Sequence, residues 1–238
     1  MQFYRSFRSP KALTFDLDDT LYDNYPVILR AEQAMYDWLA AAHPASDALS
    51  PADWQRLKYQ LAKDNPMLRH DVTEWRRVML RTGLIRLGYS QSQASEATEE
   101  GLQIVLTVRN QVDVPDLTHA VLSELAKRVP LLAITNGNVD ADKIGLGQYF
   151  SRVLVAGRDG LSKPEPDLFI QAQALLGVSA ADILHVGDHL ISDVGGARRS
   201  GFQACWFNDQ SRQMHQESNA AWLPDVEIHT LDQLLSLV

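Results

Sequence analysis

Residues 12–24, ALTFDLDDTLYDN, decide how the rest of this chain is interpreted. The apolar run at 12–15 has the character of a short buried strand, and it leads directly into the acidic residues Asp16, Asp18 and Asp19. Carboxylates this close together raise one another's pKa unless a positive charge lies among them. The stretch is therefore either an acidic, solvated turn or a site that holds a cation.

The bulk composition is that of an ordinary globular protein. The chain has 238 residues, of which 45% are hydrophobic and 22% charged, and its formal net charge is −8. Proteins that bind nucleic acids or anionic membranes need clustered Lys and Arg, so we expect neither partner. No obligate protein partner is evident either, and an anionic substrate has to be attracted by local cations.

Cysteine usage and hydropathy bear on the cellular location. Cys205 is the single cysteine, so no intramolecular disulfide can form and a reducing compartment is expected. Its neighbours at 203–207 have the pattern of a buried strand, which favours a structural thiol. The first fifteen residues lack the apolar core of a signal peptide, and no segment is apolar over the length of a membrane span. We expect a cytoplasmic protein.

Helical periodicity dominates from Pro26 to about residue 110. Pro26 opens an apolar run at helical spacing, and capping residues at Ser50, Asp71 and Ser90 begin three further helices. Four helices with short polar connections predict a small helical bundle.

After Pro115 helices alternate with short apolar strands. We expect strands at 131–135, 152–155, 183–187, 204–207 and 226–228, and helices at 116–128, 139–147, from Pro164, 191–200 and 230–237. This alternation predicts a parallel sheet covered by helices on both faces. The predicted fold is therefore α/β. A doubly wound, Rossmann-like core of residues 1–21 and 116–238 carries an inserted helical-bundle cap with hinge segments at 22–115.

Polar side chains follow the strands of this predicted sheet, at the edge where such sheets bind ligands. The candidates are Asp16, Asp18, Thr135, Asn136, Lys163, Asp188 and Asp193. Asp16 and Asp18 point to the same side of an extended chain, and with Asp188 they form an oxygen-rich cluster. Such a cluster suits a hard cation, and Mg²⁺ fits it best. No His or Cys spacing indicates zinc.

A small-molecule phosphate ester would complete the arrangement. Mg²⁺ and Lys163 can offset its charge of about −1.5 to −2, while Thr135 and backbone N–H groups near Asn136 bind its oxygens. One carboxylate can attack phosphorus to form an aspartyl-phosphate. The other can protonate the leaving oxygen and later deprotonate the attacking water.

Four motifs, in this order along the chain, resemble those of the haloacid dehalogenase-like hydrolase superfamily. They are DLDDT at 16–20, AITNGN at 133–138, SKPEPDLF at 162–169 and HVGDHLISDV at 185–194. The resemblance covers nearly the whole chain. It implies that the helical insert is a cap that closes over the site and excludes water.

The same resemblance implies a role for each motif residue. Asp16 would be the nucleophile and Asp18 the general acid and base. Mg²⁺ would be bound by the Asp16 side chain, the Asp18 backbone carbonyl and Asp188, with Asp193 supporting these ligands. Thr135 and Lys163 would bind the phosphoryl group.

Three longer stretches, at 3–24, 70–76 and 181–206, are similar to the YigB-type phosphatases of this superfamily. That narrower resemblance implies flavin-related substrates, namely the riboflavin precursor 5-amino-6-(5-phospho-D-ribitylamino)uracil and FMN. The four motifs themselves carry no feature that reads the leaving group.

Several alternatives stay open. On the same fold, the chain could hydrolyse sugar or nucleotide phosphates or act as a phosphomutase, whereas a dehalogenase would need neither Asp18 nor Asp188. A receiver-like, non-catalytic phospho-binding domain also uses an acidic cluster, a Thr and a Lys, but the paired acids and the helical insert argue against it. A catalytically inactive scaffold conflicts with the complete set of acids and Lys163.

Some single residues also have a simpler structural explanation. Asp193 could cap the following helix, and His185 fits a packed core histidine better than a ligand, while His189 fits a plain loop residue. Four residues of the insert could read a ribityl chain or a flat ring, although bundle core or a solvated helix face is the favoured explanation: Arg69, His70, Trp75 and Arg76.

Overall fold

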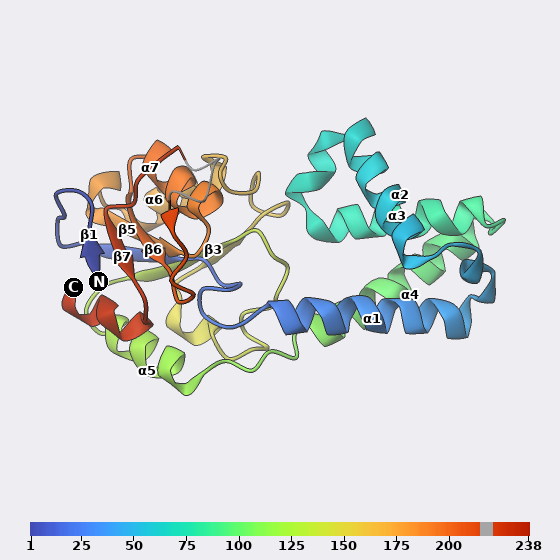
Figure 1. Ribbon diagram of the computed structural model, residues 1–238, viewed down its shortest axis with the longest axis horizontal. Coiled ribbons are helices and arrows are strands. Elements are labelled where there is room, and N and C mark those ends of the chain that lie inside the picture. Colours follow the sequence, from blue (N-terminus) through green and yellow to red (C-terminus); the bar gives the residue numbers. More distant parts are fainter. Residues whose placement is uncertain (215–220) are drawn as a thin grey trace. The chain divides into compact units, whose positions relative to one another are not determined.

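The structure, a computed structural model, describes residues 1–214 and 221–238 and separates into two compact units (Figure 1). Unit 1 comprises Met1–Asp23 and Asp113–Val238, and unit 2 comprises Asn24–Val112. The boundaries expected from the sequence were 21/22 and 115/116, a few residues away. None of the helices in the described parts of the chain is long and apolar enough to cross a membrane.

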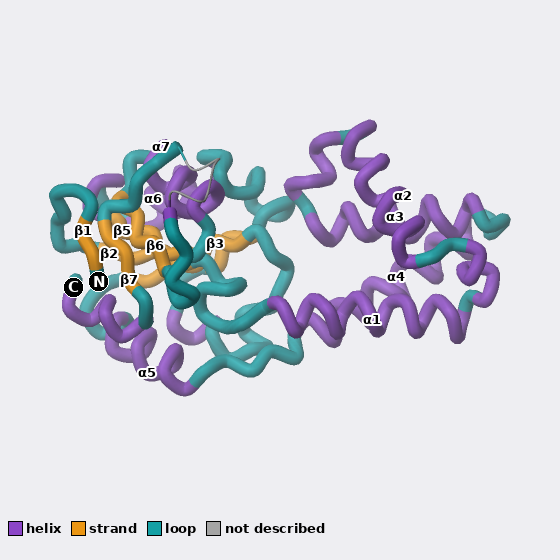
Figure 2. The backbone as a smooth tube through the Cα atoms, in the orientation of Figure 1, coloured by secondary structure: helices purple, strands orange, loops and turns teal. Residues whose placement is uncertain are grey.

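Unit 1 is built on a sheet of seven strands among the described residues, in the order β1-β7-β6-β5-β2-β3-β4 (Figure 2). The strands are β1 Gln2–Phe3, β2 Ala12–Phe15, β3 Leu131–Thr135, β4 Val153–Val155, β5 Ile183–Gly187, β6 Gln203–Phe207 and β7 Val226–Ile228. Neighbours pair in parallel, except that β1 runs antiparallel to β7. The edge strand β1 was missed because two residues carry no readable pattern.

Helices cover both faces of this sheet (Figure 1). One face carries α6 (Asp167–Leu176), the π-helical turn η5 (Leu190–Gly195) and α7 (Gly196–Arg199), whose apolar side chains share a core with the strands. The other face carries α5 (Asp116–Leu125) and the 3₁₀ segment η7 (Leu231–Ser236). Two further 3₁₀ turns are η3 (Gly147–Tyr149) and η4 (Ala180–Asp182). Burial on both faces explains the almost wholly apolar strands.

Unit 2 is a helical bundle. Its helices are α1 Tyr25–Ala42, α2 Pro51–Asp64, α3 Val72–Arg86 and α4 Gln91–Arg109, with 3₁₀ turns η1 Pro44–Ala48 and η2 Pro66–His70. Ser50 and Ser90 each form a capping box at the start of α2 and α4. In the core, a Cβ at Gly83 would overlap the Trp54 ring, so this glycine makes room for the indole.

The expected helix at 139–147 was wrong, because this segment forms turns. The Asp140 side chain accepts hydrogen bonds from the backbone N–H groups of Asp142 and Lys143, which holds a turn. Gly145 has φ +76°, a left-handed conformation that interrupts any helix.

Three other helix predictions were partly wrong. Pro164 does not open a helix; α6 begins only at Asp167, since Glu165 precedes Pro166 and the residue before a proline disfavours helical backbone. The segment 191–200 divides into the π-helical turn η5 and the short α7. At the C-terminus, the expected helix 230–237 is the 3₁₀ segment η7.

Candidate active site

The strand order places three of the four motifs at one edge of the sheet. β2 lies between β3 and β5, and Phe15 at its end is in register with Ala133 and Val186. The backbone N–H of Asp16 still bonds to the carbonyl of Val186, at 2.9 Å. Asp16 therefore leaves the sheet between the ends of its two neighbours, as ligand sites of parallel sheets do.

Three carboxylates meet at this edge. Asp16, Asp188 and Asp193 each offer a carboxylate oxygen, and these oxygens lie within 4.8 Å of one another. Asp16 follows β2, Asp188 follows β5, and Asp193 belongs to the π-helical turn η5. The donor atoms are all carboxylate oxygens, which is the ligand type that Mg²⁺ prefers. The residues present therefore fit the cation expected from the sequence.

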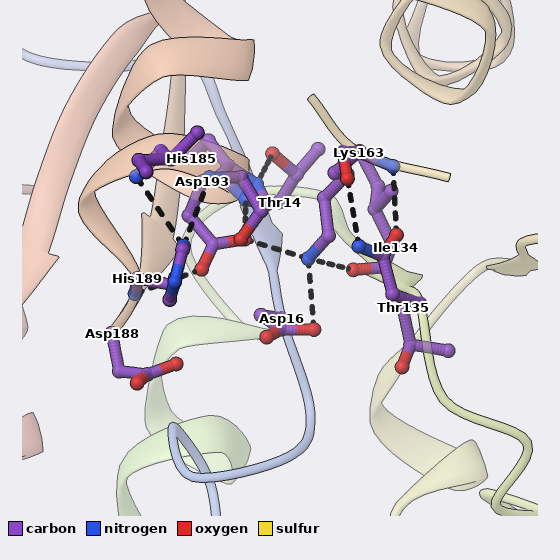
Figure 3. Close-up of polar contacts among 12 residues, drawn as sticks. Thr14, Asp16, Ile134, Thr135, Lys163, His185, Asp188, His189 and Asp193 are labelled. Atoms are coloured by element: carbon purple, nitrogen blue, oxygen red, sulfur yellow. Dashed lines mark hydrogen bonds and ion pairs between the residues drawn. The ribbon is translucent and has the colours of Figure 1, made fainter. Parts of the chain in front are cut away.

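Lys163 lies between two of these acids (Figure 3). Its Nζ is 2.8 Å from Oδ1 of Asp16 and 2.7 Å from Oδ1 of Asp193, and it donates a third hydrogen bond, 2.7 Å, to the carbonyl of Ile134. Only 3% of Lys163 is exposed. All three ammonium hydrogens are thus engaged, so a phosphoryl oxygen that binds Lys163 has to share one of them.

The pKa values of the three acids are shifted in different directions. Burial raises the pKa of Asp16 well above its usual range, against the opposing charge of Lys163. Burial and the charge of Asp193 raise the pKa of Asp188 to about 7. Burial also opposes ionisation of Asp193, but the Lys163 charge and a hydrogen bond from His185 outweigh it, so the pKa of Asp193 lies well below its usual range. A bound cation would favour the charged forms of Asp16 and Asp188.

Asp18 occupies a different position from the one expected. Its side chain is not in the carboxylate cluster; it accepts a hydrogen bond from the Tyr22 hydroxyl, and the backbone at Asp18 and Tyr22 forms an isolated bridge. The chain turns just beyond this pair, where the N–H groups of Thr20 and Leu21 both bond to the carbonyl of Leu17. The sequence did not predict the contact between Tyr22 and Asp18, because it depends on the turn at residues 19–21.

Thr135 and Asn136 organise the neighbouring loop. The Thr135 hydroxyl is buried and accepts a 2.9 Å hydrogen bond from the N–H of Gly137. The Asn136 amide donates to the Lys163 carbonyl, at 2.8 Å, and accepts from the Lys163 N–H, at 2.7 Å. These bonds tie the Lys163 loop to the end of β3. In this structure Asn136 therefore positions Lys163, and direct phosphate binding by either residue stays a prediction.

Two contacts at Asp188 were missed from the sequence. Its backbone carbonyl accepts hydrogen bonds from Trp206 Nε1 and Arg212 Nη2, both 2.8 Å, and Arg212 Nη2 is 3.6 Å from its Oδ2. Trp206 was visible as a strand residue, but Arg212 lies in a polar stretch without periodicity. His189, expected to be a plain loop residue, accepts two backbone N–H bonds through Nδ1 at the start of η5.

The residues outside this cluster divide into two groups. His185 is a packed core histidine, as expected, and Cys205 is buried, with its thiol pKa raised by burial. The four residues of the insert lie in unit 2, where Arg69 is exposed and the other three are partly buried: His70, Trp75 and Arg76. Trp75 lies against Lys58, whose Nζ is 4.7 Å from the ring centroid.

Comparisons with known proteins agree with the geometry. A family model described as haloacid dehalogenase-like hydrolase matches residues 10–201. The chain is 44% identical to the 5-amino-6-(5-phospho-D-ribitylamino)uracil phosphatase YigB of Escherichia coli (strain K12) over 238 residues, which is 100% of each. A phosphoserine phosphatase of Thermus thermophilus is 28% identical, over 94% of this chain and 97% of its own.

A solved structure shows the same fold. The crystal structure of a 2-haloacid dehalogenase from Pseudomonas syringae pv. Tomato matches with a TM-score of 0.90 and 36% identity, covering 96% of this chain and 97% of that chain. The matched family model, the full-length relative and the shared fold lead to one conclusion: this chain belongs to the haloacid dehalogenase-like hydrolases.

Proposed function

We propose that this chain is a Mg²⁺-dependent phosphomonoester hydrolase that acts through an aspartyl-phosphate on Asp16. The observation that carries the proposal is the cluster of Asp16, Asp188 and Asp193, in which Lys163 pairs with Asp16 and Asp193. It supplies a nucleophile, ligands for a hard cation and a buried positive charge at one place. Relatives across the whole chain are named phosphatases, which supports the same activity.

Asp16 and Asp188 would hold the cation with their side chains, and Asp18 would contribute its backbone carbonyl. When bound, Mg²⁺ offsets the negative charge of the phosphate and keeps the nearby carboxylates ionised. Asp193 supports the site indirectly, because it fixes Lys163 through the 2.7 Å ion pair.

The reaction would proceed in two displacements. A carboxylate oxygen of Asp16 attacks phosphorus, a new P–O bond forms, and the bond to the leaving oxygen breaks while Asp18 donates a proton to that oxygen. Water then attacks the aspartyl-phosphate, Asp18 takes up its proton, and inorganic phosphate and free Asp16 are released. The Tyr22 hydroxyl, bonded to the Asp18 carboxylate, would orient the acid for both proton transfers.

Hydrolysis of a phosphate ester gives roles to Asp18 and Asp188, two acids that a dehalogenation does not need. A halide leaves without a proton, and attack by one carboxylate on a haloacid needs no metal. Asp18 and Asp188 then have no task, although Asp188 sits in the carboxylate cluster and Asp18 is held by Tyr22. We therefore favour the phosphatase over the activity named for the similar crystal structure.

For the substrate, we favour flavin-related phosphates. The support is the full-length, 44% identity to a phosphatase named for 5-amino-6-(5-phospho-D-ribitylamino)uracil. FMN carries the same phosphoribityl chain and is the practical test compound. Sugar phosphates, nucleotides and phosphomutase substrates are the alternatives on the same site, and unit 2 is the proposed cap over it.

A phosphate-release screen with Mg²⁺ tests both levels of the proposal. It would compare FMN with sugar phosphates, nucleotides and phosphoserine, and it would include halide release from 2-chloropropionate as a matched assay. We expect phosphate release with FMN among the best substrates and no halide release. Good turnover of other esters with poor FMN turnover would reject the flavin assignment, and halide release alone would reject the phosphatase.

Replacing the nucleophile gives the sharpest single variant. Asp16→Asn removes the attacking oxygen but keeps nearly the same volume, so we expect kcat to fall by at least about 10³-fold with the melting temperature little lowered. Steady-state kinetics and circular dichroism would measure the two effects. Substantial turnover in a folded Asp16→Asn protein would remove Asp16 from the nucleophile's role.

A further inference from the structure

A buried threonine–histidine pair lies beneath the nucleophile and has no part in the mechanism above. Thr14 of β2 and His185 of β5 are in register in the sheet, with exposed fractions of 0% and 1%. Thr14 Oγ1 and His185 Nδ1 are 2.9 Å apart. Both residues point to the same face as α6, where the Phe169 ring packs edge-on against the imidazole at 5.1 Å.

The other side of the imidazole touches the site. His185 Nε2 is 3.3 Å from Oδ1 of Asp193, and this same oxygen is 2.7 Å from Lys163 Nζ (Figure 3). Lys163 Nζ in turn is 2.8 Å from Oδ1 of Asp16. A continuous series of polar contacts therefore runs from the centre of β2 through His185, Asp193 and Lys163 back to the residue that follows β2.

The position of each proton in this series follows from the partners. The Asp193 carboxylate can only accept, so Nε2 of His185 must carry the hydrogen that it donates. In a neutral ring Nδ1 is then an acceptor, and the Thr14 hydroxyl donates to it. The Thr14 contact thus selects the tautomer that can hold Asp193.

We infer that Thr14 and His185 are positioning residues for the hydrolysis, because they fix Asp193, which fixes Lys163 against the nucleophile. The inference rests on the proposed function for its kinetic consequence, though not for the tautomer. Asp193 is held at its second oxygen as well, by the His189 N–H at 3.0 Å. Loss of the imidazole contact would leave Oδ1 of Asp193, the oxygen that pairs with Lys163, without its hydrogen bond from His185.

Two substitutions at His185 separate positioning from packing. Glutamine can place its amide nitrogen near Nε2 and still donate to Asp193, whereas asparagine reaches only the Nδ1 position and contacts Thr14 alone. Both bury an amide and remove part of the ring. We expect His185→Gln to retain most of kcat, and His185→Asn to lose about 10²-fold, the usual cost of a small misplacement at a reacting centre. Equal kcat values at equal melting temperature would overturn the inference.

A second pair of variants tests Thr14. Thr14→Val removes the hydroxyl and should lower kcat, and Thr14→Ser, which keeps it, should restore activity. Thr98 of α4 is the matched control, since it is also 1% exposed and its hydroxyl has no hydrogen-bond partner among the described residues. Thr98→Val should leave kcat unchanged. A Thr14→Val enzyme as active as Thr98→Val would contradict the role of Thr14.

The tautomer is measurable without any turnover. In ¹⁵N-labelled protein, long-range ¹H–¹⁵N spectra distinguish a protonated Nε2 from a protonated Nδ1, and the signals lost in His185→Gln identify this ring among the seven histidines. We expect Nε2–H with Nδ1 unprotonated. A protonated Nδ1 would overturn the arrangement, whereas a correct tautomer in a protein that hydrolyses no phosphate ester would overturn only the proposed function.

Discussion

At the scale of single residues, the site combines three carboxylates with very different ionisation. Asp193 has a cation and a hydrogen-bond donor at 2.7 and 3.3 Å, whereas the nearest cation to the Asp188 carboxylate is Arg212 at 3.6 Å in the described structure. That difference in pairing explains why the pKa of Asp193 is lowered and that of Asp188 is raised. Asp188 is thus an acid whose charge at neutral pH depends on a bound metal.

This leads to a pH prediction for Asp188. With its pKa raised to about 7 in the folded protein and about 3.9 when unfolded, the folded state holds the extra proton between these values. In metal-free protein this group therefore makes stability fall as pH rises from about 4 through 7. Asp188→Asn should flatten that decline.

Urea unfolding with EDTA at several pH values would measure the difference between the two proteins. Added Mg²⁺ binds the ionised carboxylate and should favour the wild type most at high pH. Identical pH dependence in wild type and Asp188→Asn would contradict the assignment.

At the scale of elements, the end of β5 is shaped by the packing of Asp193. A Cβ built on Gly187 would overlap the Asp193 carboxylate, so the strand can end here only with glycine. The same acid is drawn inward from the π-helical turn by Lys163 and by the His189 N–H. The end of β5 and the π-helical turn η5 therefore both pack closely around the Asp193 side chain.

We expect Gly187→Ala to displace Asp193, to destabilise the fold by about 1–3 kcal/mol through overpacking, and to lower kcat sharply. Gly195→Ala is the control in the same turn, because its Cβ would meet its nearest neighbour at an ordinary 3.5 Å. Thermal melts and kinetics of both variants would test this. If Gly187→Ala behaved like Gly195→Ala, the close fit would be disproved.

The elements also show what periodicity can and cannot predict. Apolar strands and amphipathic helices were predictable because burial imposes their pattern. The segment after β3 was misjudged because the Asp140 turn and Gly145 act through hydrogen bonds and backbone angles rather than through apolar spacing. The site was predictable where motifs mark it, but contacts such as Thr14 with His185 depend on strand register, which a sequence does not display.

At the scale of the whole molecule, the proposed metal site joins distant parts of unit 1. Asp16 belongs to its first segment and Asp188 to its second. A cation bound by both would therefore stabilise the folded state of unit 1, since the unfolded chain does not bring them together.

Removing the metal should accordingly affect both activity and stability. EDTA should suppress phosphate release, and Mg²⁺ should restore it and raise the melting temperature, by an amount equivalent to about 2.7 kcal/mol at a hundredfold excess over Kd. Asp188→Asn should show little of this increase. Full activity in EDTA, or a melting temperature insensitive to Mg²⁺ in the wild type, would refute the metal site.

The division of unit 1 into two segments also has a consequence during synthesis. Unit 2 is continuous, from Asn24 to Val112. All the segments that pack together in it have therefore been synthesised once Val112 has left the ribosome, so unit 2 can fold before the rest of unit 1 is made. β2 pairs with β3 and β5, and β1 with β7, which are made much later. β2, which leads into Asp16, therefore stays unpaired until its partner strands have been made and the sheet can assemble.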